Sequence, residues 1–378
     1  MKKIIKPSKR ELFLFLLVIA LTIFGAIMVY SASSYSALKN YGNQYFFLIK
    51  QLVGVFIGTG LMIFFYFFDY HKLKKLKWFI VIFSSILLIL VFIPGIGIEN
   101  YGARRWIGAF GVTIQPSEIA KFAFVIFASA YLSDYYQNIK KFKYILPVLL
   151  IGGLFCLLII VEPNMSITMC MGMVMLIMLF IGGVKGKHFA SLCVPAAAAV
   201  PVLIFMEPYR IKRLLAFLDP WQSPQAEGFQ LIQSLYSLGS GGWFGVGLFN
   251  SRQKYLFLPF AESDFIFSII GEELGFIGAI GIMAVFVIIV VMLIKIALNA
   301  KDRFGALLTS GIASVIAVQT LINIAVVTGS IPPTGLPLPF ISAGSTSLLV
   351  FMSAIGVVLN VDRQSHKAQF NHYTSFTD

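Results

Sequence analysis

Long apolar runs, separated by short polar segments, follow one another along the whole chain. A run of about 20 apolar residues can cross the hydrocarbon core of a membrane as an α-helix. Backbone groups in lipid must be paired internally, so runs of this length are helical. The pattern therefore predicts an all-α polytopic membrane protein with about ten transmembrane helices. The expected segments are 12–31, 46–67, 78–95, 116–132, 144–161, 165–183, 188–207, 265–298, 306–328 and 339–360.

Positive charge in the loops predicts the orientation of these segments. Most of the 29 lysines and arginines lie in the N-terminal segment, which includes Lys2, Lys3 and Lys6, and in every second loop after it. Loops rich in Lys and Arg remain in the cytoplasm, so both termini are expected there. Acidic residues gather mainly in the opposite loops, where two loops hold both signs of charge. We therefore expect the chemistry on the outer face.

One connection is much longer than the others. Residues 208–264 exceed the usual length of a loop between helices, and loops of this length are functional or fold on their own. We find no internal repeat and no low-complexity tract. The expected organisation is one membrane domain over residues 1–378, with the extracytoplasmic loop 208–264 carrying the active-site region.

The composition agrees with a membrane protein. Hydrophobic residues make up 58% of the chain and charged residues 12%, against about 25% charged residues in a soluble domain. The net charge of +13 is spread over short loops and is not gathered on one face, which argues against a nucleic-acid partner. The 3 cysteines lie within apolar runs and the 4 histidines are scattered, so neither disulfides nor a histidine metal site are expected.

A first polar cluster lies between the third and fourth apolar runs. Arg104 and Arg105 beside Trp106 form a candidate clamp for a phosphate or pyrophosphate. Glu118 and Lys121 share one helix face at the membrane boundary, where charges usually line a cavity. The alternative interpretation is an ion pair that locks two helices together, with Trp106 as an interface anchor.

The long outer loop contains several distinct stretches. Residues 209–217 form a short basic amphipathic segment suited to an anionic membrane surface. A glycine-rich stretch follows at 239–247, and such backbones can approach phosphate oxygens. It lacks the Gly-Lys-Ser and the preceding strand of a nucleotide loop.

Asp264 is the sharpest candidate residue in this loop. It lies where the loop enters the eighth apolar run, near the positive end of a helix. With Arg252 or Lys254 nearby, its carboxylate is a candidate general base. The alternative is that Ser263 and Asp264 cap the helix.

Further polar residues lie within or next to the last apolar runs. Glu272 and Glu273 are carboxylates at membrane depth that need partners, and Lys121 is one candidate. Four prolines within 332–339 preclude a regular helix and predict a rigid outer or re-entrant loop with a structural role. The glycines at the two ends of 54–58 match a small-residue helix-packing motif.

These segments, in this order, resemble the RodA/FtsW/SpoVE (SEDS) family. The resemblance covers nearly the whole chain, and its details are most similar to the FtsW/SpoVE branch. The matching stretches are 28–33, 105–108, 115–118, 208–213, 233–236, 251–254, 263–267, 272–276 and 335–340.

The resemblance implies a ten-helix protein of the bacterial cytoplasmic (inner) membrane. The implied activity is that of a peptidoglycan glycosyltransferase, which polymerises lipid II into glycan strands on the outer face for cell division, cell shape or the spore cortex. A class B penicillin-binding transpeptidase is the implied partner, and membrane lipids surround the protein.

The resemblance also assigns expected roles to site residues. Asp264 matches the essential loop aspartate, expected to activate the 4-hydroxyl of the acceptor GlcNAc for attack on the anomeric carbon of the growing chain. Arg104, Arg105 and Lys121 are expected to stabilise the leaving pyrophosphate, a task for preorganised cations. The resemblance leaves room for a divalent cation and names no ligand for it. Substrate-binding roles are likewise expected for Trp106, Ser117, Glu118, Gln233, Ser251, Arg252 and Lys254.

The chain departs from the family pattern at three places. Glu162-Pro163-Asn164 stands where the family commonly has Gln-Pro-Asp, and Pro259-Phe260 stands for Pro-Glu, with Ser263 in place of threonine. Residues 343–347 replace a Tyr-Gly-Gly-Ser-Ser stretch. These departures keep open a weakly active scaffold that recruits a penicillin-binding transpeptidase.

A lipid II flippase or other transporter is a further alternative. It predicts charges along a path open to both faces and broken helices in paired positions. We see no second half that mirrors the first, and the polar residues gather on the outer side.

Overall fold

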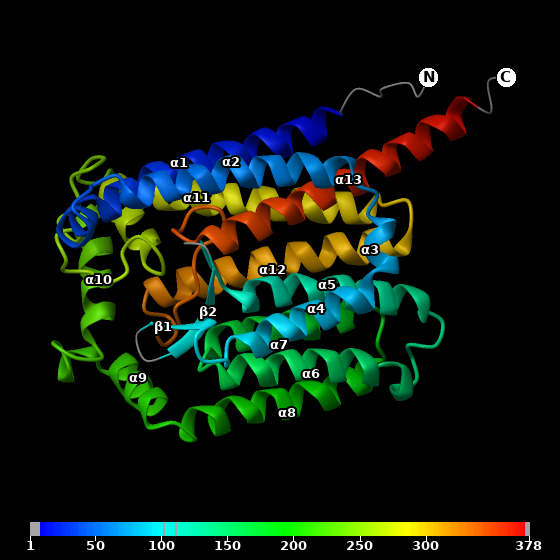
Figure 1. The fold of residues 1–378 in the computed structure, drawn as a ribbon, viewed down its shortest axis with the longest axis horizontal. Helices are drawn as coiled ribbons and strands as arrows, with labels where there is room; N and C mark the ends of the chain where they lie inside the picture. The colour runs from blue at the N-terminus through cyan, green and yellow to red at the C-terminus, as the bar shows by residue number, and fades with distance from the viewer. Residues whose placement is uncertain (1–7, 101–102, 110–111, 375–378) are drawn as a thin grey trace.

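A computed structural model describes residues 8–100, 103–109 and 112–374, and it consists almost entirely of helices (Figure 1). Each of the ten predicted segments overlaps one helix, so the all-α polytopic architecture is confirmed. These helices are α1 (Lys9–Tyr41), α2 (Phe46–Phe67), α4 (Lys77–Leu90), α5 (Pro116–Asp134), α6 (Leu146–Val161), α7 (Met165–Ile181), α8 (Gly186–Phe205), α11 (Ile266–Leu298), α12 (Arg303–Val327) and α13 (Ser345–Thr374).

The remaining elements are short and lie in the connections. They are α3 (His71–Lys75), β1 (Gly97–Asn100), β2 (Ala103–Ala109), β3 (Val112–Ile114), the 3-10 helices η1 (Phe142–Tyr144) and η2 (Pro220–Gln222), α9 (Pro208–Leu218) and α10 (Phe229–Gly241). The N-terminal Lys2, Lys3 and Lys6 lie outside the described residues.

The length and hydropathy of the helices fit a multi-pass membrane protein. Six described helices are long and apolar enough to cross a membrane, and α4, α6 and α7 are shorter apolar helices. Many of their side chains are large, apolar and exposed, as helices surrounded by lipid require. None of the described side chains of α8 is buried, so this helix lies at the margin of the bundle.

Close approach of α2 and α13 joins the beginning and the end of the chain. A Cβ on Gly58 would lie 2.4 Å from the Met352 sulfur, and one on Gly54 would lie 3.2 Å from a Leu348 methyl carbon. The small-residue packing motif on α2 is thereby confirmed. Gly356 of α13 makes the reciprocal contact, because its Cβ would fall 2.4 Å from the Met62 carbonyl oxygen.

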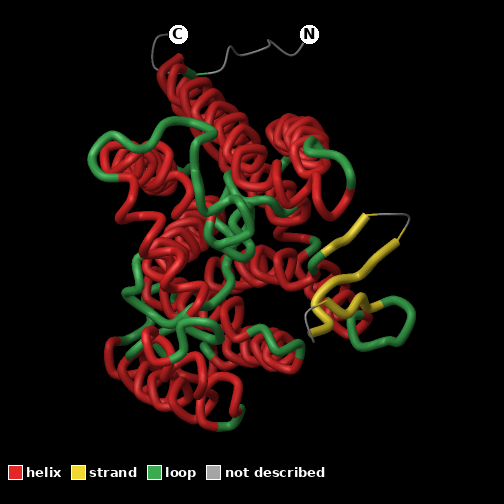
Figure 2. The backbone as a smooth tube through the Cα atoms, turned by 90° about the vertical axis from the view of Figure 1, so that its left-hand side faces the viewer, coloured by secondary structure: helices red, strands yellow, loops and turns green. Residues whose placement is uncertain are grey.

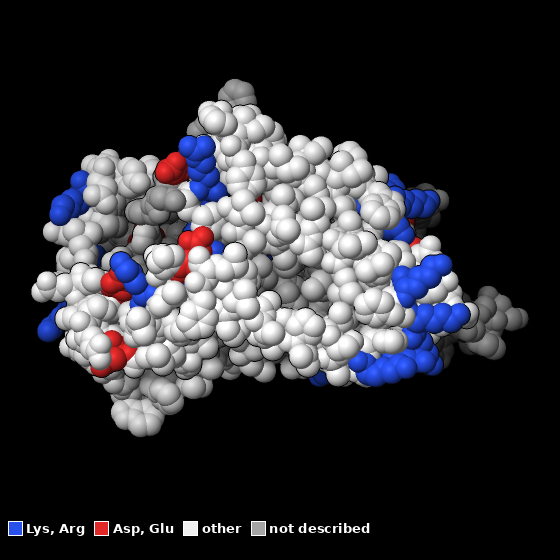
Figure 3. All heavy atoms as spheres, turned by 90° about the horizontal axis from the view of Figure 1, so that it is seen from below, with Lys and Arg blue, Asp and Glu red and all other residues white. Residues whose placement is uncertain are grey.

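The two ends of the bundle differ in charge. The start of α1 and the end of α13 lie at one end, here called the terminal end, and α9, α10 and the strands lie at the other, the loop end (Figure 1). Lysines and arginines gather at the terminal end, at the right of Figure 3, whereas both signs of charge are mixed at the loop end.

The loop end contains structure that the apolar pattern did not predict. β1, β2 and β3 form an antiparallel sheet in that order, with Ile98 opposite Trp106 and Ile107 opposite Ile114. Figure 2 looks onto this end and shows the sheet beside the helices, with loops between them. The segment 208–264 forms α9, η2 and α10 before it returns to α11. The sheet lies in the connection between α4 and α5.

The contact between α2 and α13 gives a first test. We expect Gly356→Ala to destabilise the protein by about 1–3 kcal/mol, because the new methyl group would overlap backbone atoms of Met62 that cannot move aside as a side chain can. Gly60→Ala, on α2, is the matched control, since no atom lies within 4 Å of the added carbon. Thermal unfolding in detergent would measure both variants. Equal stability of the two would contradict this packing.

Candidate active site

Asp264 lies in the loop that enters α11, and it does not cap that helix. α11 begins at Ile266, its capping residue is Phe265, and no side chain caps its first turn. The capping alternative for Ser263 and Asp264 is therefore wrong. The half-buried Asp264 carboxylate interacts with the Ser263 hydroxyl and accepts no capping hydrogen bond from the first turn of α11.

The loop with four prolines within 332–339, here called the proline-rich loop, is joined to the Asp264 loop by buried hydrogen bonds. The Asn323 side chain on α12 donates to the backbone carbonyls of Asp264 (2.8 Å) and Leu336 (2.7 Å). The Ser342 hydroxyl donates to the carbonyl of the residue before Asp264 (2.6 Å). Gly335 has a φ of +87°, and a Cβ there would lie 3.1 Å from Asp264 Oδ2. The proline-rich loop therefore forms one wall of the site.

Two arginines from distant parts of the chain supply positive charge near Asp264. Burial raises the pKa of Asp264 to about 6, and the guanidinium groups of Arg105 on β2 and Arg213 on α9 oppose that rise. The sequence suggested Arg252 or Lys254 instead. The carboxylate is thus ionised at neutral pH, yet close enough to its pKa to accept a proton.

The sheet separates the two arginines that were expected to act as one clamp. Arg105 donates through Nε to the carbonyl of Glu162 (3.3 Å) and through Nη2 to that of the next residue (2.5 Å). Arg104 is exposed and pairs with Glu99 at 3.1 Å. Neighbouring side chains on a strand point to opposite faces. Arg105 alone of the two acts on Asp264, and Trp106 is half-buried within the sheet.

Glu162 is a buried acid at the outer limit of α6. Neither of its carboxyl oxygens meets a hydrogen-bond donor among the described residues. Burial raises the pKa of Glu162 to about 8, against the opposing charge of Arg105. Burial therefore favours the protonated, neutral form of this side chain, which carries no charge, like a glutamine. Asn164 accepts a hydrogen bond from the Ile167 N–H (3.3 Å) as the N-cap of α7, a position that suits aspartate equally well.

Glu118 and Lys121 form a buried ion pair at the start of α5. Lys121 Nζ lies 2.9 Å from Glu118 Oε1 and also donates to Gln319 on α12. Gln319 in turn donates to the Pro337 carbonyl (2.8 Å), so the network reaches the proline-rich loop. Ser117 is buried beside them, and its hydroxyl finds no partner within the described part of the chain. The helix-locking ion pair considered from the sequence is present.

Glu272 and Glu273 are buried on α11 and are held by hydroxyl and backbone groups. The Ser251 hydroxyl donates to Glu272 (2.5 Å) and its backbone N–H donates to Glu273 (3.2 Å). The Ser31 hydroxyl on α1 also donates to Glu273 (2.5 Å). The suggestion that Lys121 pairs with these acids is wrong.

The segment around residue 251 is attached to α11 in the same way. Arg252 donates its backbone N–H to Glu272 (2.9 Å) while its side chain is exposed. Lys254 is buried, and its ammonium group donates to the Phe249 carbonyl. Gln233 is half-buried on α10. A substrate-binding role for these residues stays a prediction.

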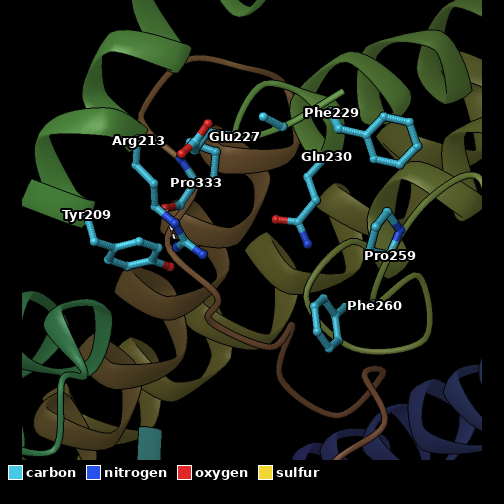
Figure 4. A pocket seen from close by; sticks show the side chains of 9 residues that line it. Tyr209, Arg213, Glu227, Phe229, Gln230, Pro259, Phe260 and Pro333 are labelled. Carbon is cyan, nitrogen blue, oxygen red and sulfur yellow. Dashed lines mark hydrogen bonds between the residues drawn. The ribbon is translucent and has the colours of Figure 1, made fainter. Parts of the chain in front are cut away.

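A pocket of about 460 Å³ opens at the loop end, lined by residues of α9, α10, the Asp264 loop and the proline-rich loop, and Asp264 itself does not line it (Figure 4). Arg213 lies over the Tyr209 ring at 4.5 Å and donates to the Pro333 carbonyl (3.2 Å). Figure 4 shows Gln230 pointing towards Arg213 from the other side of the pocket. Because Arg213 also acts on Asp264, the pocket and Asp264 belong to one site.

Several residues of this site were not predicted from the sequence. Arg213 was part of a basic stretch interpreted as a membrane-surface helix, and Gly335 was part of a loop given a structural role. Asn323 is a polar residue in an otherwise apolar run, which marks a residue with buried partners. Only the fold shows that these three meet at Asp264.

The described residues near Asp264 do not form a set of three metal ligands. The set that could share an ion is Glu11, Asp362 and His366, whose ligand atoms lie within 4.8 Å of one another on α1 and α13. Arg10 already pairs with Asp362, and Tyr66 donates to Glu11 (2.9 Å). In the part of the chain described, Asp264 therefore does not fit a cation held by three protein ligands.

This chain is similar to a known family and to known proteins over most of its length. The family model for FtsW, RodA and SpoVE, described as "Cell cycle protein", matches residues 11–367. Stage V sporulation protein E of Bacillus subtilis (strain 168) is 41% identical over 361 residues, covering 95% of this chain and 99% of that protein. The probable peptidoglycan glycosyltransferase FtsW of Geobacter sp. (strain M18) is 40% identical over 365 residues, covering 95% and 98%.

Solved structures have the same fold. A chain from a peptidoglycan synthase complex that coordinates polymerization and crosslinking is 27% identical, with a TM-score of 0.78 and coverage of 94% of this chain and 98% of that one. The rod shape determining protein RodA of Thermus thermophilus has a TM-score of 0.70 at 24% identity, covering 94% and 97%. The latter likeness concerns the fold alone.

The buried ion pair on α5 gives a second test. We expect Lys121→Met to destabilise the protein by about 3–5 kcal/mol, because it leaves the Glu118 carboxylate buried without its cation. Adding Glu118→Gln should recover most of that loss, since the remaining side chain is neutral. Chemical unfolding in detergent would measure both variants. A single variant as stable as the unmodified protein would contradict a structural role for the pair.

Proposed function

The chain belongs to the FtsW/RodA/SpoVE family, and on that premise we propose that it is a peptidoglycan glycosyltransferase with Asp264 as its general base. The substrate is lipid II, which the enzyme polymerises into glycan strands for cell division, cell shape or the spore cortex. The observation that carries the proposal is the Asp264 carboxylate, which is half-buried, free of helix capping and flanked by Arg105 and Arg213.

The proposed step is a displacement at a sugar carbon. Asp264 takes the proton of the acceptor GlcNAc 4-hydroxyl as that oxygen attacks the anomeric carbon of the growing chain. A glycosidic C–O bond forms and the bond from the anomeric carbon to the pyrophosphate breaks. Undecaprenyl pyrophosphate leaves with the bonding electron pair. A base with a pKa of about 6 is suited to such a transfer near neutral pH.

Arg105 is the residue best placed to stabilise the leaving pyrophosphate. Its guanidinium group acts on Asp264 and is fixed by backbone carbonyls before any substrate arrives. Fixed cations stabilise developing charge without reorganisation. Arg104 and Lys121, considered for the same task, are engaged with Glu99 and Glu118.

The charge distribution supports an orientation. We propose that the terminal end, with its gathered lysines and arginines, faces the cytoplasm and that the loop end faces outward (Figure 3). Asp264 then meets lipid II on the outer face of the bacterial cytoplasmic membrane. A class B penicillin-binding transpeptidase is the proposed partner, supported by the likeness to a chain of a peptidoglycan synthase complex.

Removal of the base tests the activity. We expect Asp264→Asn to lower the rate of polymerisation of purified lipid II at least a hundredfold, because the amide cannot accept the proton. Glu99→Gln, which changes an exposed acid at the same end, is the matched control and should retain activity. Glycan length would be analysed by gel, with and without the transpeptidase.

Three other outcomes would contradict the proposal. Full activity in folded Asp264→Asn would exclude Asp264 as the base. Absence of polymer under all conditions, with transpeptidase binding intact, would favour a scaffold. Translocation of lipid II without polymer would favour a transporter.

The pKa of Asp264 predicts a pH profile. Because the base must be ionised, we expect kcat/KM to fall about tenfold per pH unit below about pH 6. Arg213→Gln removes a charge that lowers this pKa, so the inflection should move to higher pH. Polymerisation rates at low lipid II concentration between pH 5 and pH 8 would show both effects. An unchanged inflection in Arg213→Gln would contradict the coupling.

A further inference from the structure

The pocket at the loop end holds one charged group of each sign. Arg213 and Glu227 both line it, and Figure 4 shows them at the same side of the cavity. They form no salt bridge with each other, and no cation among the described residues lies within salt-bridge distance of Glu227. The site therefore offers a carboxylate and a guanidinium group to the same ligand.

The other walls of the pocket are mostly flat and apolar. Tyr209 and Pro333 lie beside the charges, and Phe229, Pro259 and Phe260 line the opposite side of the pocket (Figure 4). An apolar pocket of about 460 Å³ with a few convergent polar groups is typical of a ligand site. Such walls contact peptide planes and aliphatic side chains well, whereas the polar groups fix their orientation.

The charges distinguish between the parts of lipid II. A pyrophosphate would meet the Glu227 carboxylate as a like charge, which is unfavourable. The sugars carry no charge and would leave both groups without a counterpart. The stem peptide is the part that carries carboxylates and, on its third residue, a primary amine. Its chemistry matches the pocket.

We propose that this pocket binds the stem peptide of lipid II, with Glu227 receiving a primary ammonium group and Arg213 a peptide carboxylate or carbonyl. This inference rests on the proposed function and adds a determinant of substrate specificity to it. Glu227 is a specificity residue in this scheme and takes no part in the proton transfer.

The position of the pocket explains how a peptide contact assists the reaction. Phe260 lines the pocket and lies four positions before Asp264 in the same loop. Arg213 also lines the pocket, and its positive charge lowers the pKa of Asp264. A stem peptide held here keeps its own sugar next to the base. Binding energy from this remote part of the substrate then helps to position the reacting hydroxyl.

The test uses three forms of lipid II that differ in the third-residue amine. In the first the amine is free, in the second it is acetylated and neutral, and in the third it is succinylated and negative. Polymerisation would be measured as kcat/KM for the unmodified protein, Glu227→Gln and Glu227→Lys. Glu207→Gln is the matched control, since Glu207 is exposed at the start of α9 and does not line the pocket.

We expect the unmodified protein to prefer the free amine over the acetylated form about tenfold, as one charge-assisted hydrogen bond would give. Glu227→Gln should reduce that preference to less than about twofold, largely by losing rate with the free amine. Glu227→Lys should prefer the succinylated form, and Glu207→Gln should behave like the unmodified protein.

Two results would overturn the inference. One is an undiminished preference for the free amine in Glu227→Gln, and the other is equal rates of the unmodified protein with the free and acetylated forms. Failure of the unmodified protein to polymerise any of the three forms would instead overturn the proposed function, so the two failures are distinguishable.

Discussion

The loop end of this protein depends on two adjacent buried carboxylates, Glu272 and Glu273. Moving a carboxylate from water into the protein interior costs free energy. Hydrogen bonds or a counter-charge must offset that cost. Here hydroxyl and backbone donors from α1, α10 and the segment after residue 250 meet the pair. These donors are far apart in the sequence. Because all of them bond to the same two glutamates on α11, they fix the position of the long loop against this helix. The position at which Asp264 precedes α11 is fixed in the same way.

A second set of buried bonds sets the shape of the site itself. Asn323 ties the carbonyls of Asp264 and Leu336 together, and Gln319 ties Lys121 to the proline-rich loop. None of these polar groups needs to move for Arg105 and Arg213 to face the carboxylate. Sites that fix their charges in advance stabilise a transition state more effectively than flexible ones. The proline-rich loop, α12 and the sheet are therefore parts of one preorganised frame.

Much of the fold followed from the sequence, because a membrane imposes a simple rule on apolar length. Each of the ten segments overlaps a helix, and most ends agree within six residues, but α1 continues ten residues past the predicted end at 31 and α13 continues fourteen past the predicted end at 360. The sheet formed by β1, β2 and β3 was not predicted, since its strands are short and lie between apolar runs, where that rule has no force. Asp264 was selected from local pattern and family resemblance. Its partners were not, because Arg213, Asn323 and Gly335 approach it only through tertiary contacts.

The kink at Gly275 divides α11 into two parts, and the side chains of each part point in directions that are set separately. Gly275 has a φ of +69°, and a Cβ there would lie 2.3 Å from the Gly245 backbone nitrogen, so only glycine fits. In a continuous helix each residue advances by about 100°, and a one-residue insertion rotates everything beyond it. Here that phase is interrupted. The direction in which Glu272 and Glu273 point is therefore set by the short part of α11 before the kink, and the long part after it takes its own direction through the bundle.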